Sequence, residues 1–311
     1  MMNYIKSELY RMFHSRMIYV TALGFAGAPL LLNGLLYATF RTMPDNAYSY
    51  TSFSYSFLIS LPMFFCVAAF IVVLSLYEGD KKTGNMKNVV ASGISRVKIF
   101  AGQIVVSLVA CYSILIATLA VYILSARLLL VDAGPATWMD LVKEALVMSP
   151  IAISALILAV VVTMVFEKTF VAVMVWSGIL YFIPTVFFYV GIRYPVIWKI
   201  SEWMPDNFLS YIEVNTSVCN PMWDTPEGLT KCMVAGAVGI VVFGLAGLCL
   251  VRKRKYKNKG LYENIDLLSV WRDWDGISAV AGGSTCAGGC GGAVLDAETL
   301  FATHSRPTVG N

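Results

Sequence analysis

The chain has 311 residues, a formal net charge of +4, and a composition that is 58% hydrophobic but only 14% charged. Soluble domains carry about 25% charged residues, so this composition excludes an ordinary soluble fold and indicates a membrane protein. The basic residues stand at the ends of apolar runs instead of in one block, which argues against a nucleic-acid partner. With two histidines and scattered cysteines, we expect no metal site.

Residues 1–16 form an amphipathic segment ahead of the first apolar run. Wound as a helix, the segment separates Lys6 and Arg11 from an apolar side made of Tyr4, Ile5, Leu9, Met12 and Phe13. This pattern predicts an interfacial helix that lies along the inner leaflet. We expect no cleavable signal peptide, because the first apolar run is long enough to span and no convincing cleavage site follows it.

Six apolar runs follow, and each is long enough to cross the roughly 30 Å of hydrocarbon that about 20 helical residues span. None has Asp, Glu, Lys or Arg in its interior, and none alternates as a barrel strand does. We therefore predict an all-α, polytopic membrane protein whose six transmembrane helices lie within residues 17–254. The runs are 17–38, 55–77, 101–125, 145–166, 169–190 and 232–251.

Lysine and arginine concentrate before the first run, between the second and third runs, and after the sixth run. Positive loops stay in the cytoplasm, so both the N- and C-termini are predicted to be cytoplasmic. The opposite loops contain the aromatic residues of an interfacial belt: Tyr48, Tyr50, Trp138, Trp198 and Trp203.

The outer segment 191–230 contains apolar residues at helical spacing within 194–209. They predict a short interfacial or re-entrant helix, with a plain apolar loop as the alternative. Cys219 and Cys232 flank the end of this segment, and the sequence leaves open whether they pair.

The most informative polar stretch is the loop 77–100. Asp80 and the lysines after it are expected to begin a short helix around 83–90, which Ser92-Gly93 ends, and Ser95-Arg96 begins the next span. A rigid cytoplasmic helix here is what a lever driven by a soluble motor requires. An ordinary basic loop that only fixes topology fits the same residues, and physics alone leaves both readings open.

Recognisable catalytic motifs are missing. The stretch from Gly79 to Asn85 has two glycines at phosphate-loop spacing but lacks the Lys-Ser/Thr that must follow, so it predicts no nucleotide site. The absence of ionisable groups from the six runs also argues against an ion-coupled carrier, which generally needs one within the membrane. Energy for transport is then expected to come from another subunit.

The tail 255–311 is basic at first and then rich in glycine, with Cys286 and Cys290 in its Gly-rich part. Such a composition buries too little apolar surface to fold alone, so a disordered extension is expected. A loose similarity of Gly282-Gly283 and its surroundings to double-glycine bacteriocin leaders is the alternative.

The order of these features resembles the membrane subunits of type-2 ATP-binding-cassette (ABC) transporters over roughly residues 1–255. Glu78, Lys82-Thr83-Gly84 and the step from Ser92 to Arg96 are similar to that family's loop between spans two and three. The segment 4–13 resembles its inner-leaflet connecting helix. The outer segment containing Pro205 resembles its extracellular helical hairpin.

The resemblance implies a permease subunit that is not itself an enzyme. It would dimerise with an identical or similar second permease chain and bind a soluble ABC ATPase, which would hold ATP and magnesium, with no cofactor on this chain. Lys6, Arg11 and Arg16 would anchor the first helix to anionic lipid. The residues implied to transmit force from the ATPase are Glu78, Asp80, Lys81, Lys82, Thr83, Gly84, Ser92, Gly93 and Arg96.

In the same interpretation, small residues would allow close helix approach, as Gly24 with Ala28 and Ala235 with Gly239. Four prolines would kink spans or be tolerated within them: Pro29, Pro62, Pro150 and Pro184.

The compact size suits a small exporter of a peptide antibiotic or drug-like molecule in a bacterial cell membrane. A membrane scaffold or sensor that transports nothing is one alternative, and an ion-coupled carrier is another.

Overall fold

The structure, a computed structural model, describes residues 2–42, 49–83, 94–210, 212–215, 218–221 and 224–253. The side chains of residues 2, 78–83, 212–221 and 253 are outside this description. The described residues belong to one compact unit, Met1–Lys255. The predicted tail 255–311 lies outside the described residues.

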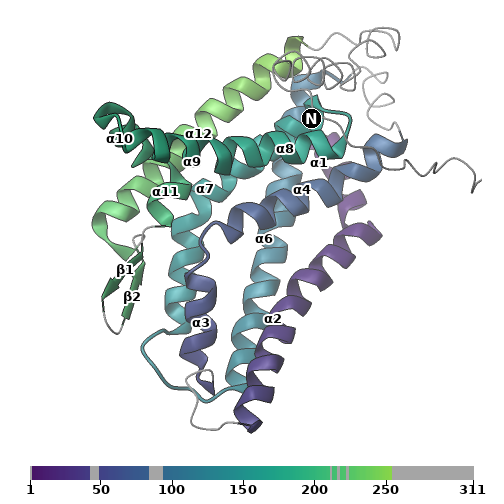
Figure 1. Ribbon diagram of the computed structural model, residues 1–311. Coiled ribbons are helices and arrows are strands. Elements are labelled where there is room, and N and C mark those ends of the chain that lie inside the picture. The colour runs from purple at the N-terminus through teal and green to yellow at the C-terminus, as the bar shows by residue number, and fades with distance from the viewer. Residues whose placement is uncertain are drawn as a thin grey trace, which may run out of the picture. The chain divides into compact units, whose positions relative to one another are not determined.

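Helices dominate the described part of the chain (Figure 1). A two-stranded antiparallel hairpin, in which Ile212 pairs with Pro221, is added to the predicted all-helical fold. The elements are α1 Met2–Phe13, α2 Arg16–Thr42, α3 Thr51–Ile59, α4 Phe64–Thr83, α6 Arg96–Leu129, α7 Trp138–Val165, α8 Thr169–Ser177, the π-helical turn η2 Gly178–Phe182, α9 Ile183–Gly191, α10 Pro195–Ser201, α11 Pro205–Leu209, β1 Ile212–Asn215, β2 Val218–Pro221 and α12 Pro226–Lys253.

Five helical segments in the described residues are long and apolar enough to span a membrane: α2, α6, α7, the continuous α8–η2–α9 and α12. A sixth span requires α3 and α4 to count together, and these two helices meet at an angle of 72°. The predicted span over 55–77 is therefore two helices, and the break lies at the predicted kink. Pro62 lies in the break and supplies no backbone N–H, which explains why the helix is interrupted there.

The other prolines are accommodated differently. Pro29 and Pro150 lie inside helices that continue past them, α2 and α7. Pro184 follows the π-helical turn η2, and its missing N–H removes the bond that a regular helix would make to residue 180. Of the four predicted kinks, the sharp bend is therefore the one near Pro62.

Helix α7 is the centre of the bundle. In its most apolar stretch 61% of the residues are buried, against 11–22% in the other four candidate spans. α12 packs along it, and α4 also contacts it extensively (Figure 1). The Trp176 ring of α8 stacks on Phe70 of α4, with 4.4 Å between centroids, and donates a hydrogen bond to the Ala155 carbonyl oxygen of α7.

Glycines bring α12 close to α7. A Cβ atom at Gly236 would lie 2.4 Å from Cβ of Pro150, and one at Gly239 would lie 2.7 Å from Cβ of Ser154. The predicted close approach at Gly239 is therefore confirmed. Gly24, by contrast, has open space around it within the described residues, so α2 uses no such contact here.

The segment 191–230 contains two short helices, α10 and α11, where the sequence predicted one. Asn207 of α11 joins its neighbours by donating hydrogen bonds to the Pro184 carbonyl oxygen at 3.0 Å and to Oγ of Ser201 at 2.8 Å. Burial raises the pKa of the adjacent Asp206 carboxyl. Cys232, at the start of the last helix, is a buried free thiol, and the Cys219 side chain lies outside the described residues.

Candidate functional site

Helix α1 is bound to the bundle through one face. Met12 is buried with Ile18 of α2, Val72 of α4 and Val106 of α6, and Ile5 and Leu9 pack beside them. The apolar side predicted to face lipid is thus largely covered by protein. The physical reason is that α4 and α6 offer an apolar surface at the same level, which the sequence of α1 does not reveal.

Gly102 of α6 makes room for this contact. A Cβ atom at Gly102 would lie 2.6 Å from a ring carbon of Tyr4. The Tyr4 ring therefore rests directly on the backbone of α6, where any larger residue would displace it.

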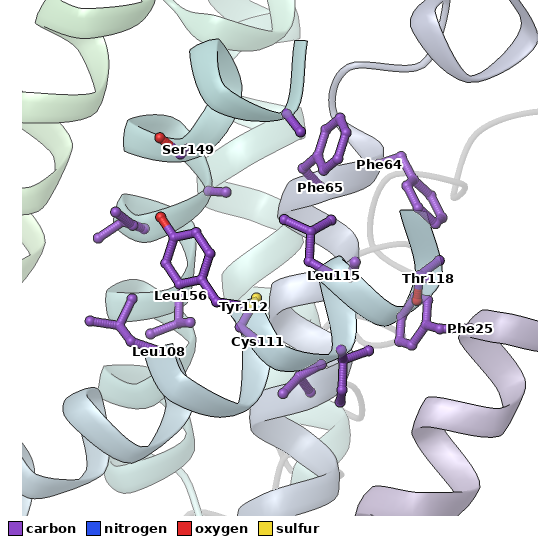
Figure 2. A pocket seen from close by; sticks show the side chains of 16 residues that line it. Phe25, Phe64, Phe65, Leu108, Cys111, Tyr112, Leu115, Thr118, Ser149 and Leu156 are labelled. Carbon is purple, nitrogen blue, oxygen red and sulfur yellow. The ribbon is translucent and has the colours of Figure 1, made fainter. Parts of the chain in front are cut away.

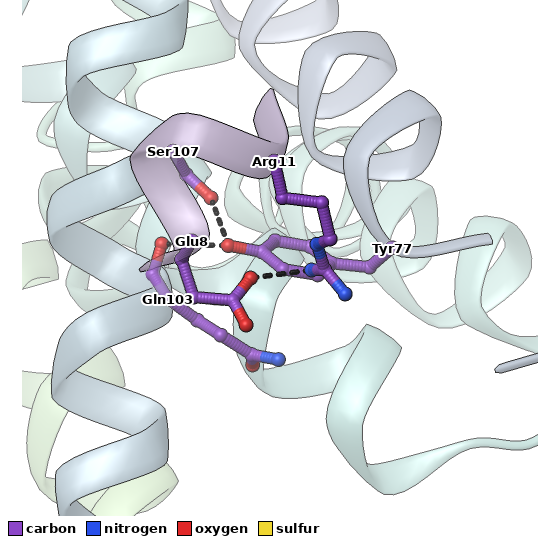
Figure 3. A network of polar contacts seen from close by, with 5 residues as sticks. All are labelled: Glu8, Arg11, Tyr77, Gln103 and Ser107. Carbon is purple, nitrogen blue, oxygen red and sulfur yellow. Dashed lines mark hydrogen bonds and ion pairs between the residues drawn. The ribbon is translucent and has the colours of Figure 1, made fainter. Parts of the chain in front are cut away.

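A polar junction lies beside this contact, and we call it the Tyr77 junction (Figure 3). The Tyr77 hydroxyl donates a hydrogen bond to the Gln103 carbonyl oxygen at 3.0 Å, and the Ser107 hydroxyl donates to the Tyr77 oxygen at 3.2 Å. Tyr77 is only 4% exposed. Besides Tyr77, Gln103 and Ser107, the junction includes Glu8 and Arg11 of α1.

The charged pair of the junction comes from α1. Glu8 is buried and forms an ion pair with Arg11, one helical turn away. Figure 3 shows both side chains in the same polar network as Tyr77. A charged pair on α1 therefore belongs to the junction at the end of α4, where the predicted coupling residues begin.

Several predicted coupling residues belong to α4 itself. The helix continues through Asp80 to Thr83, so Asp80 lies inside α4 and does not begin a new helix, contrary to the prediction. All of α4 lacks proline, and the residues from Glu78 to Thr83, apart from Gly79, allow the helix to continue. Residues 84–90 of the predicted short helix lie outside the described residues.

The other end of the predicted coupling loop is the start of α6. This helix begins at Arg96, as predicted. Gly84, Ser92 and Gly93 lie outside the described residues. The loop therefore connects α4 to α6, which are the two helices that the Tyr77 junction joins.

The residues expected to anchor lipid are divided by the structure. Lys6 and Arg16 are exposed. Arg11 is half-buried in its ion pair with Glu8. Lys6 and Arg16 thus remain available to a membrane surface, whereas Arg11 contributes to the junction.

An apolar pocket lies between α2, α4, α6 and α7 (Figure 2). Its cavity volume is about 40 Å³. Phe25, Phe64 and Phe65 contribute aromatic rings, and the few polar atoms of the lining come from Cys111, Tyr112, Thr118 and Ser149. Such a surface suits an apolar or amphipathic molecule.

Sequence reasoning missed Tyr77 and Glu8. Glu8 stands four residues from both Tyr4 and Met12, a spacing that places it on the apolar side of α1 and indicated its burial. Tyr77 is the last residue of an apolar run, and nothing local distinguishes it from an interfacial tyrosine.

Residues 4–185 match the family model described as ABC-2 family transporter protein. No curated protein and no solved structure matches the chain. The matched range includes α1, the Tyr77 junction, the predicted coupling loop and the pocket.

Proposed function

The chain belongs to the ABC-2 family of transporter proteins and is a multi-pass membrane permease, and from this premise we propose that it is the permease subunit of an ABC exporter. In this proposal it supplies the transmembrane path and is driven by a separate soluble ATPase. ATP and magnesium bind to that partner. The path forms between this chain and a second, identical or similar, permease.

The observation that carries the proposal is the Tyr77 junction. Tyr77 is followed directly by the charged turns of α4 that are proposed to meet the ATPase, Glu78 to Thr83. Its hydroxyl is hydrogen-bonded to the main chain of α6, the helix at the other end of the same loop. A push on the loop would therefore move α4 and α6 together instead of bending the loop alone.

The α1 helix adds a second connection. Its Glu8–Arg11 pair belongs to the Tyr77 junction, and its apolar residues pack against α4 and α6. With Lys6 and Arg16 on the exposed side, the helix would rest on anionic lipid while bearing on the junction. It would thus support the base of the lever.

The proposed topology has six spans with both ends in the cytoplasm. It counts α3 and α4 as one broken span and rests on the positive charge of the segments before α2 and between α4 and α6. The proposed location is the bacterial cytoplasmic membrane. The apolar pocket supports an amphipathic peptide antibiotic or drug-like molecule as substrate.

The decisive experiment is purification from the native membrane in mild detergent, with ATPase assays and mass identification of bound proteins. A stoichiometric soluble ABC ATPase is expected. A well-folded preparation without one would reject the proposal. In that case ion-driven flux in ATP-free vesicles would identify a carrier, and no flux would indicate a scaffold or sensor.

A further inference from the structure

The apolar pocket between α2, α4, α6 and α7 is elongated along the helices. On α6 its wall extends from Leu108 to Thr118, which is about 15 Å along the helix axis. On α7 it extends over a similar length, from Ala145 to Leu156, and the lining residues of each helix share one face. Figure 2 shows Thr118 at one end of the pocket and Leu108 at the other.

The pocket is also narrow and uncharged. Its cavity volume is about 40 Å³, whereas pockets that hold drug-sized ligands measure roughly 300–1,000 Å³. None of the described residues that line it is charged. The Ser149 hydroxyl in its wall already donates a hydrogen bond to the Leu146 carbonyl oxygen, at 2.7 Å. This space suits one unbranched apolar chain and is too small for a whole drug-like molecule.

The pocket lies at the depth of the hydrocarbon core and reaches the surface of the described chain. Its α6 wall, 108–118, is the middle of the apolar run 101–125. Phe65 and Val72 form buried parts of the lining, whereas Phe64 and Tyr112 are 37% and 39% exposed. At this depth the molecules that surround a spanning helix are the acyl chains of the bilayer.

We propose that this pocket binds the distal part of one acyl chain of a bilayer phospholipid. An apolar slot left empty would lose the dispersion contacts of its lining, and a chain that enters from the side restores them without desolvating any polar group. The proposal rests on the membrane location alone and holds whether or not the protein exports anything. An exported amphiphile would use the pocket only by displacing the chain, with most of its own bulk elsewhere.

The first test counts the lipid that stays bound during purification of the full chain in mild detergent, by native mass spectrometry. A single phospholipid per wild-type chain is expected. Ala152→Phe places a ring in the pocket and should abolish this retention. Ala117→Phe adds the same ring at an exposed position of α6 outside the pocket and should retain the lipid. Thermal unfolding of both variants checks that they are folded.

The second test needs no variant. Wild-type protein in lipid nanodiscs is cross-linked to a phospholipid with a diazirine near the end of one acyl chain, and the labelled residues are identified by mass spectrometry. Labelling should concentrate on the pocket residues of 108–118 and exceed that of Leu124 and Leu128, which are exposed on the same helix outside the pocket. A diazirine next to the headgroup should leave the pocket unlabelled.

Equal labelling of the pocket and of the exposed leucines would overturn the proposal, because the pocket would then hold no chain in preference to the surrounding bilayer. Equal lipid retention by wild type and a folded Ala152→Phe would overturn it as well, since the retained lipid would lie elsewhere. Retention of a non-lipid amphiphile in place of phospholipid would replace the proposed occupant with an exported molecule.

Discussion

The hydroxyl of Tyr77 donates a hydrogen bond to the main-chain carbonyl oxygen of Gln103, with 3.0 Å between the two atoms. The bond joins α4 to α6 at the two ends of the proposed coupling loop. Its acceptor is a backbone atom, so substitutions at position 103 leave the bond available. This hydrogen bond therefore depends on the Tyr77 hydroxyl and on no other side chain.

Tyr77→Phe removes the hydroxyl and keeps the aromatic ring. We expect an intact membrane protein, destabilised by about 1 kcal/mol, whose substrate-stimulated ATPase activity in the reconstituted complex is clearly reduced. Tyr112→Phe removes a hydroxyl from the pocket wall and is the matched control. Equal coupling in the two variants would show that the Tyr77 bond transmits nothing.

Gly102→Val tests the docking of α1. Its side chain would occupy the position of the Tyr4 ring, so α1 should separate from α6 and become accessible to proteases near residues 2–13. Gly24→Val, at a site with open space, controls for the loss of glycine from a spanning helix. Unchanged proteolysis of both variants would contradict the proposed contact.

Gly236→Val should separate α12 from α7, since its side chain meets Pro150. We expect a loss of about 1–3 kcal/mol of stability, measured as a lower Tm in detergent. Gly244→Val lies on the same helix, has nothing within 4 Å of its Cβ position, and should unfold like the wild type. Similar losses in both would indicate a general intolerance of valine in α12.

Asn33→Leu removes a buried amide that donates to the Ser125 hydroxyl at 2.7 Å and accepts a hydrogen bond from the Ser54 hydroxyl at 2.6 Å. Both hydroxyls keep a second hydrogen bond to Tyr122. A loss of about 1–2 kcal/mol is expected from the lost interhelical hydrogen bonds, again measured by thermal unfolding. Thr21→Val, whose hydroxyl bonds only within its own helix, should cost less. Equal losses would mean that the interhelical bonds contribute nothing to stability.

The combined substitution of Glu78, Lys81 and Lys82 by alanine tests the proposed ATPase contact. Membrane insertion should be unaffected, whereas co-purification of the ATPase and coupled ATP hydrolysis should fall. The same change at Glu227, Lys231 and Lys199 removes matching charges from the opposite side of the proposed topology. Normal coupling in the first triple variant would reject the lever.

Hydropathy alone predicted most of the spanning segments. Five of the six apolar runs correspond to long candidate spans. The length and apolarity of a run are local properties, and the thickness of the hydrocarbon core sets the same requirement for each run. The start of α6 at Arg96 and the family were also accessible, since both depend on short motifs in a fixed order.

Tertiary contacts decided the rest. The sequence predicted no partner for Glu8, and the apolar run that it predicted for α7 began at residue 145. Both Glu8 and Glu144 are nevertheless buried in the bundle. Whether a charged or polar side chain faces lipid, water or protein depends on helices tens of residues away in the sequence. The hydrogen bond from Tyr77 to Gln103 is one example. The sequence by itself therefore determined a multi-pass membrane chain and its family. Only the packing of α1, α4, α6 and α7 determined which polar groups meet, because burial is a property of the assembled helices and not of any single run.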